Sequence, residues 1–75
     1  MGSHYRLHLE QFPWPVSVLN FNRTLDAMQP GDDLIATMLD PDVVGNLRQL
    51  LGSQPGLRYT VWLTEAEYRI QVIKG

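Results

Sequence analysis

The fold is decided by one stretch of the chain, Leu34-Ile35-Ala36-Thr37-Met38-Leu39-Asp40-Pro41. Its first six residues are almost continuously apolar and have the length of a strand, which is typical of a central strand that is covered or flanked on both sides. Asp40 and Pro41 indicate the start of a helix, because aspartate caps free amides and proline suits the first helical position. The stretch therefore predicts a central strand that leads directly into a helix.

Upstream of this stretch the sequence predicts a strand, a stiff connector and a helix. Residues 5–10 alternate apolar and polar with Tyr5, Leu7 and Leu9 facing inward. The connector at residues 12–15 contains two prolines, which remove amide donors and exclude a central strand. A helix follows from Pro15, which suits its first turn, and ends at the turn of residues 29–32. Its apolar residues recur at spacings of three and four: Val18, Phe21, Leu25 and Met28.

Downstream, the sequence predicts a second helix and a hairpin. The helix has a stripe formed by Val43, Val44, Leu47, Leu50 and Leu51. Residues 57–64 and 68–73 alternate on either side of a short turn, the pattern of a β-hairpin. The order is strand-helix-strand-helix-strand-strand, and a right-handed crossover makes the first two strands parallel. We therefore expect an α+β two-layer sandwich, with a mixed four-stranded sheet, both helices on one face and Trp62 on the open face.

The composition limits the chain to one small domain and excludes several kinds of chemistry. Its 75 residues carry a net charge of −2 and no cysteine, which excludes disulfides, thiolate metal sites and cysteine nucleophiles. The six basic residues are scattered among eight acidic ones, so direct binding of nucleic acid is not expected. The sequence shows neither a membrane-spanning apolar run nor a signal-peptide pattern. We expect a cytoplasmic domain at residues 5–75, preceded by a disordered, tag-like segment at residues 1–4.

The run from Trp14 to Met28, the Pro30-Gly31-Asp32 turn, the apolar strand and the Asp40-Pro41 pair together resemble the TusA (SirA-like) sulfur-carrier family. That family has a Cys-Pro-x-Pro motif at the start of its first helix, a basic residue later in that helix, a Pro-Gly-Asp or Pro-Gly-Glu turn and an Asp-Pro pair. The likeness extends roughly from residue 7 to residue 74. It implies the same fold, and docking onto partner proteins through the start of the first helix.

The cysteine of that family has no counterpart in this chain. Counted back from the Pro-Gly turn without a gap, Trp14 stands at the cysteine position, Ser17 on the second proline and Arg23 on the basic position. A register based on the two prolines places Phe12 there instead and needs two extra residues. In both registers an aromatic side chain replaces the thiol, so the sulfur-carrying chemistry does not transfer and we do not expect an enzyme.

The leading hypothesis is a non-catalytic protein-interaction module without a cofactor or metal. By resemblance, its partner is a sulfur-handling enzyme or a true sulfur carrier. Trp14 is either a preorganised, exposed anchor for that partner or a lid packed over the end of the core, and the sequence leaves both alternatives open. The candidate binding residues are Phe12, Pro13, Trp14, Pro15, Ser17 and Arg23.

Other functions remain as alternatives. Arg23 and the free amides near residues 16–18 would suit a small-ligand or anion-binding site at the helix start, and a sulfur-relay role could be completed by a partner's cysteine. The open sheet face leaves room for self-association through Trp62. A metal site is not expected, because His4 and His8 lie about 13 Å apart along a strand. Pairs of acidic residues fall in predicted exposed turns, which does not favour acid–base catalysis.

Overall fold

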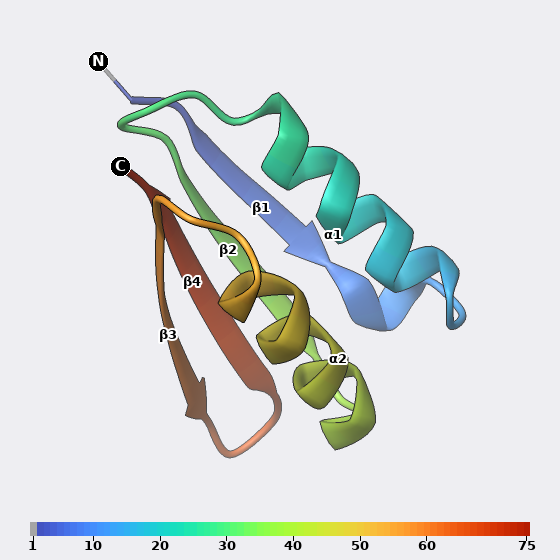
Figure 1. The fold of residues 1–75 in the computed structure, drawn as a ribbon. Helices are drawn as coiled ribbons and strands as arrows, with labels where there is room; N and C mark the ends of the chain where they lie inside the picture. Colours follow the sequence, from blue (N-terminus) through green and yellow to red (C-terminus); the bar gives the residue numbers. More distant parts are fainter. Residues whose placement is uncertain (1) are drawn as a thin grey trace.

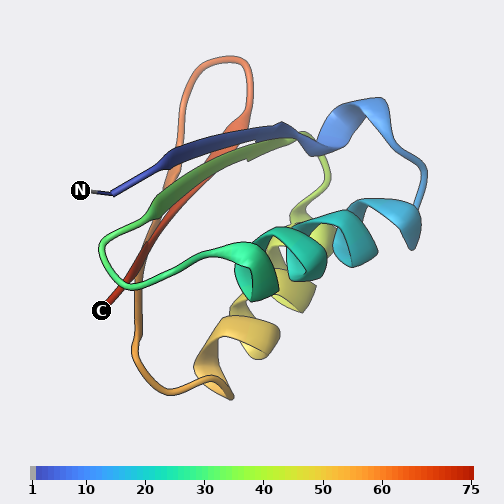
Figure 2. The ribbon, with the colours of Figure 1, turned by 90° about the horizontal axis from the view of Figure 1, so that it is seen from above.

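In residues 2–75, which the computed structural model describes, four strands form one mixed sheet and two helices cover one of its faces (Figures 1 and 2). The expected order and the α+β architecture are confirmed. Met1, the first residue of the expected tag-like segment, lies outside the described residues. The elements are β1 His4–His8, a 3₁₀ turn η1 Leu9–Gln11, α1 Val16–Ala27, β2 Asp33–Met38, α2 Pro41–Gly52, β3 Leu57–Leu63 and β4 Tyr68–Lys74.

The strand β2 lies at the centre of the sheet, as its apolar sequence predicts. The sheet order is β1-β2-β4-β3, with β2 parallel to β1 and antiparallel to β4. Leu34, Ala36 and Met38 are buried beneath the helices, and Thr37 is buried on the opposite side. The prediction that Leu39 belongs to this strand is wrong: β2 ends at Met38, and Leu39 is 61% exposed where the chain turns into α2.

Both helices begin close to the predicted positions. The Asp40 Oδ1 atom accepts a hydrogen bond of 2.9 Å from the Asp42 amide, and Pro41 is the first residue of α2. Pro15 precedes the first residue of α1 instead of lying in its first turn. Along α1, Phe21 and Leu25 are buried and the half-buried Val18 packs against them, so the predicted apolar stripe is confirmed.

The first strand is shifted relative to the predicted range of residues 5–10. It starts at His4, and the Ser3 carbonyl accepts a hydrogen bond from the Asp33 amide just before it. It stops at His8, where the chain bends into η1 and the Phe12 amide donates to the Leu9 carbonyl. Leu9 still reaches the core and is 2% exposed, because this turn keeps its side chain on the helix side.

The predicted hairpin of β3 and β4 is confirmed and completes the sheet. Ile70 and Val72 of β4 are fully buried beneath the helices. Trp62 of β3 pairs with Arg69, and its side chain alternates with that of Val61, which packs against the core beneath the helices. Trp62 therefore lies on the open face of the sheet, as expected. Within the described part of the chain, no helix is both long enough and apolar enough to cross a membrane.

Candidate functional site

The connector before α1 is held at both of its ends by main-chain hydrogen bonds. The Phe12 amide donates to Leu9, the Ser17 amide donates to Pro13 and the Leu19 amide donates to Pro15. The two prolines lack an amide hydrogen, and here their carbonyl oxygens serve as acceptors for the first turn of α1. This arrangement fixes the backbone on both sides of Trp14.

Trp14 is held in the exposed orientation and does not cover the core. Its side chain is 66% exposed, and that of Phe12 is 40% exposed. The end of the core is filled instead by Leu9 and Phe21, which are almost completely buried. This exposure argues against the lid interpretation of Trp14, and the anchor interpretation stays a prediction.

A cavity of about 180 Å³ lies beside the connector, between the starts of α1 and α2. Ser17 is 2% exposed, and its hydroxyl has no hydrogen-bond partner among residues 2–75. A buried hydroxyl without a partner is costly. The cavity is lined by Leu9, Glu10, Phe12, Trp14, Ser17, Met38, Leu39, Asp40 and Val43.

A second, shallower hollow lies on the other side of Trp14. It measures about 280 Å³ and is lined by Trp14 and Pro15 of the connector, Val18 and Leu19 of α1, and Asn46 of α2. Leu19 is 57% exposed, and Val16, three residues before it on the helix, is 40% exposed. Trp14 thus stands between two depressions, with exposed apolar side chains on each side. We call the exposed apolar residues Phe12, Trp14, Val16 and Leu19 the Trp14 surface.

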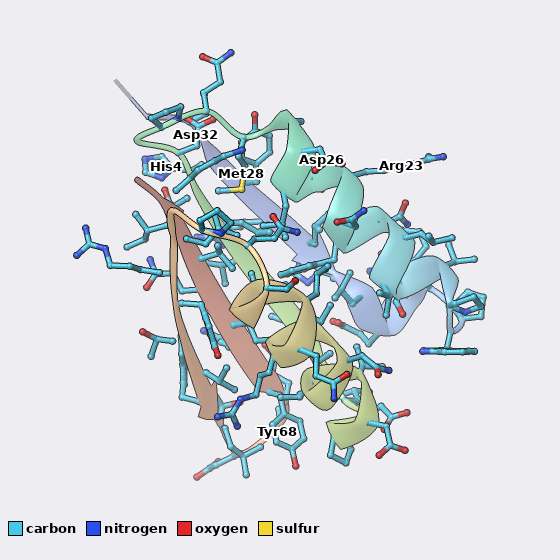
Figure 3. The ribbon with its side chains drawn as sticks, in the orientation of Figure 1. His4, Arg23, Asp26, Met28, Asp32 and Tyr68 are labelled. Carbon is cyan, nitrogen blue, oxygen red and sulfur yellow. The ribbon has the colours of Figure 1, made fainter. Side chains whose placement is uncertain are left out.

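The structure brings together some of the predicted site residues and separates others. Phe12, Trp14 and Ser17 share the cavity, and Pro15 joins Trp14 in the hollow. Pro13 contributes its carbonyl to the start of α1. Arg23 is exposed, lines neither depression, and extends from α1 into solvent (Figure 3).

Sequence reasoning missed the contribution of the second helix. Leu39 and Asp40 line the cavity because β1 and β2 are parallel and end at the same edge of the sheet, so the segments that follow them meet there. This meeting could have been inferred from the sequence, because the parallel pairing of the first two strands and the start of the second helix were both predicted. The apolar pattern predicts Leu39 to be part of the buried strand, which gives no sign of its place at the cavity.

The carboxylates that line the cavity already accept hydrogen bonds. Asp40 accepts from the α2 amide described above, and Glu10 accepts from the Thr37 hydroxyl at 2.9 and 3.1 Å. The cavity lining contains no basic residue. It therefore lacks a positively charged side chain that would pair with an anion.

A cluster of polar side chains lies on the open sheet face at the end of β1. The His8 Nδ1 atom lies 3.1 Å from the Thr37 hydroxyl and 3.6 Å from the Glu10 carboxylate. At the other end of the strand, His4 contacts Asp33. In the described residues, no three side chains from His, Asp or Glu come together in a group that could hold a metal ion.

Comparisons with protein-family models, with curated proteins and with solved structures find no match to this chain. The resemblance to the sulfur-carrier family therefore stays a prediction from the sequence.

Proposed function

We propose that this domain is a non-catalytic protein-interaction module that binds its partner through the Trp14 surface. The observation that carries this proposal is the 66% exposure of Trp14 within a connector whose backbone is held on both sides. Tryptophan is enriched among the residues that dominate binding energies at protein interfaces. A side chain on a fixed backbone also loses less conformational freedom on binding than one on a mobile loop.

The form of this surface indicates how a partner would bind. The hollow beside Trp14 would accept an apolar side chain of the partner, whose contacts would then extend along α1 over Val16 and Leu19. By resemblance to the TusA-like family, a sulfur-handling enzyme or a sulfur carrier is the proposed partner. This chain has no thiol and would supply binding rather than sulfur transfer.

Binding experiments with matched tryptophan variants test this function. The wild-type domain, Trp14→Ala and Trp62→Ala are each immobilised and exposed to an extract of the source cells, and every recovered protein is then purified and titrated by calorimetry. Trp62→Ala is the control, because it removes the same side chain from the opposite face. We expect Trp14→Ala to weaken binding about 30-fold, which corresponds to about 2 kcal/mol, and Trp62→Ala to leave it unchanged.

Two results would count against different parts of the proposal. If every recovered partner binds Trp14→Ala as tightly as the wild type, the Trp14 surface is not the interface. If the partner binds through Trp14 but has no part in sulfur transfer, the interaction surface stands and the sulfur-related partner is excluded.

A further inference from the structure

The cavity between the starts of α1 and α2 has features that protein docking on the Trp14 surface does not use. Ser17 is one of its lining residues, 2% exposed, with a hydroxyl that has no partner within residues 2–75. Most of the remaining lining is apolar and comes from η1, the connector, β2 and α2. Three lining residues, Glu10, Ser17 and Asp40, carry polar side chains. A few polar groups in a mostly apolar lining are the usual composition of a small-molecule site.

The size of the cavity limits the ligand to about one ring. A cavity of about 150 Å³ with apolar walls accommodates one benzene molecule in another protein. The present cavity measures about 180 Å³, which leaves room for a ring and one small substituent. A hydroxyl substituent would match Ser17, because each of the two hydroxyls can donate to or accept from the other.

The charges around the cavity disfavour an anionic ligand. The start of a helix carries a partial positive charge of about half a unit, which attracts anions. At α2 the full negative charge of Asp40 offsets this effect, and the lining contains no basic side chain.

From these observations we propose that the cavity binds a small molecule without a negative charge that consists of one ring-sized apolar group and a hydroxyl. The ring would lie against Phe12, Trp14 and Leu39, and the hydroxyl would bond to the Ser17 Oγ atom. This proposal goes beyond the protein-interaction function and does not depend on a protein partner.

Benzyl alcohol and benzoate are suitable probes, because they have similar sizes and differ in charge. Each is titrated into the ¹⁵N-labelled domain, and the chemical shifts of the backbone amides and of the Trp14 indole N–H are followed. Benzyl alcohol should saturate with a dissociation constant of about 1–10 mM, which is reasonable for a ligand of its size. The shifts should cluster at the cavity residues, and benzoate should bind at least about tenfold more weakly.

Two serine variants test the role of the hydroxyl. Ser17→Ala should weaken benzyl alcohol binding about threefold to tenfold, the effect of one hydrogen bond. Ser53→Ala is the control, because Ser53 is exposed and its hydroxyl bonds to the Leu50 carbonyl at the end of α2. The amide spectrum of each variant verifies that it is folded.

Three results would overturn the proposal. The first is that benzyl alcohol gives no saturable, localised shifts up to its solubility limit. The second is that benzoate binds as tightly as the alcohol, which would make the site one for anions. The third is that Ser17→Ala binds the alcohol as tightly as the wild type, which would leave the buried hydroxyl without a role in binding.

Discussion

The Lys74 ammonium group donates a hydrogen bond of 2.8 Å to the main-chain carbonyl of Met28, directly after the end of α1. It also donates to the Leu25 carbonyl at 3.2 Å. Carbonyl groups at the end of a helix lack partners within the helix and carry a partial negative charge. Lys74 therefore satisfies two of them and joins the last strand to the end of the first helix.

Replacing Lys74 by methionine should destabilise the domain by about 1–2 kcal/mol. Methionine keeps the apolar stem but removes the charged donor from both carbonyls, and hydrogen bonds to charged groups are stronger than neutral ones. Urea denaturation measures the change. Arg48→Met, at an exposed position on α2, is the control and should change stability by less than about 0.5 kcal/mol. Equal effects of the two substitutions would show that the contacts of Lys74 with α1 are not stabilising in solution.

Asp32 should make stability depend on pH in the acid range. Its carboxylate accepts hydrogen bonds from the Gln29 amide at 2.8 Å and from the Ser3 amide at 2.7 Å, at the same end of the molecule as His4 (Figure 3). These bonds, Gln29 first, lower the pKa of Asp32 below its ordinary value of 3.8. A lowered pKa contributes stability that is fully present above 3.8 and is lost as the pH falls through the folded-state value.

The corresponding experiment compares Asp32→Asn with Asp26→Asn. Urea midpoints are measured between pH 7 and pH 2 for both variants and the wild type. Asp32→Asn should be less stable than the wild type at pH 7, and the difference should shrink below pH 4. Asp26 is an exposed residue of α1, and its substitution should leave the pH profile unchanged. Parallel profiles for Asp32→Asn and the wild type would contradict the role of these two hydrogen bonds.

The architecture could be predicted from the sequence because local signals and long-range packing agree on it. The apolar run of β2, the Asp40 cap and the two alternating strands of the hairpin each specify one element. The prediction for Leu39 is wrong because an apolar run does not reveal where a strand stops. The end of β2 depends on the turn into α2, and there Leu39 remains exposed.

The candidate site could be predicted only in part. The sequence places Trp14 in a stiff connector, but exposure depends on whether other residues already fill the space beneath it, and Leu9 and Phe21 do so. Ser17 lies within the predicted anion site and is one of the predicted binding residues, yet its burial without a partner follows from the meeting of α1 and α2. Such a property arises from three-dimensional packing and leaves no pattern in a single sequence.

Fluorescence should distinguish the two tryptophans. In Trp62→Phe the remaining Trp14 should emit at the wavelength of a solvated indole and be quenched strongly by acrylamide, because its side chain is 66% exposed. In Trp14→Phe the remaining Trp62, which is 37% exposed on the sheet, should be quenched less. A blue-shifted Trp14 that acrylamide does not reach would restore the lid interpretation and remove the basis of the proposed interaction surface.

Substitution of Ser17 by alanine should stabilise the free domain by about 1 kcal/mol. The substitution removes a buried hydroxyl that has no partner in residues 2–75, and it removes the desolvation cost of that group. Part of the gain comes from the higher helix propensity of alanine, about 0.5 kcal/mol, and Asn20→Ala within the same helix measures this part. In urea denaturation, Ser17→Ala should raise the free energy of unfolding by more than Asn20→Ala does. If Ser17→Ala is instead destabilising, the hydroxyl has a bonding partner in solution. If Ser17→Ala is more stable than the wild type and also binds benzyl alcohol more weakly, Ser17 has a role in ligand binding and not in folding. Substitution of a residue that is needed only for folding would lower the stability of the protein.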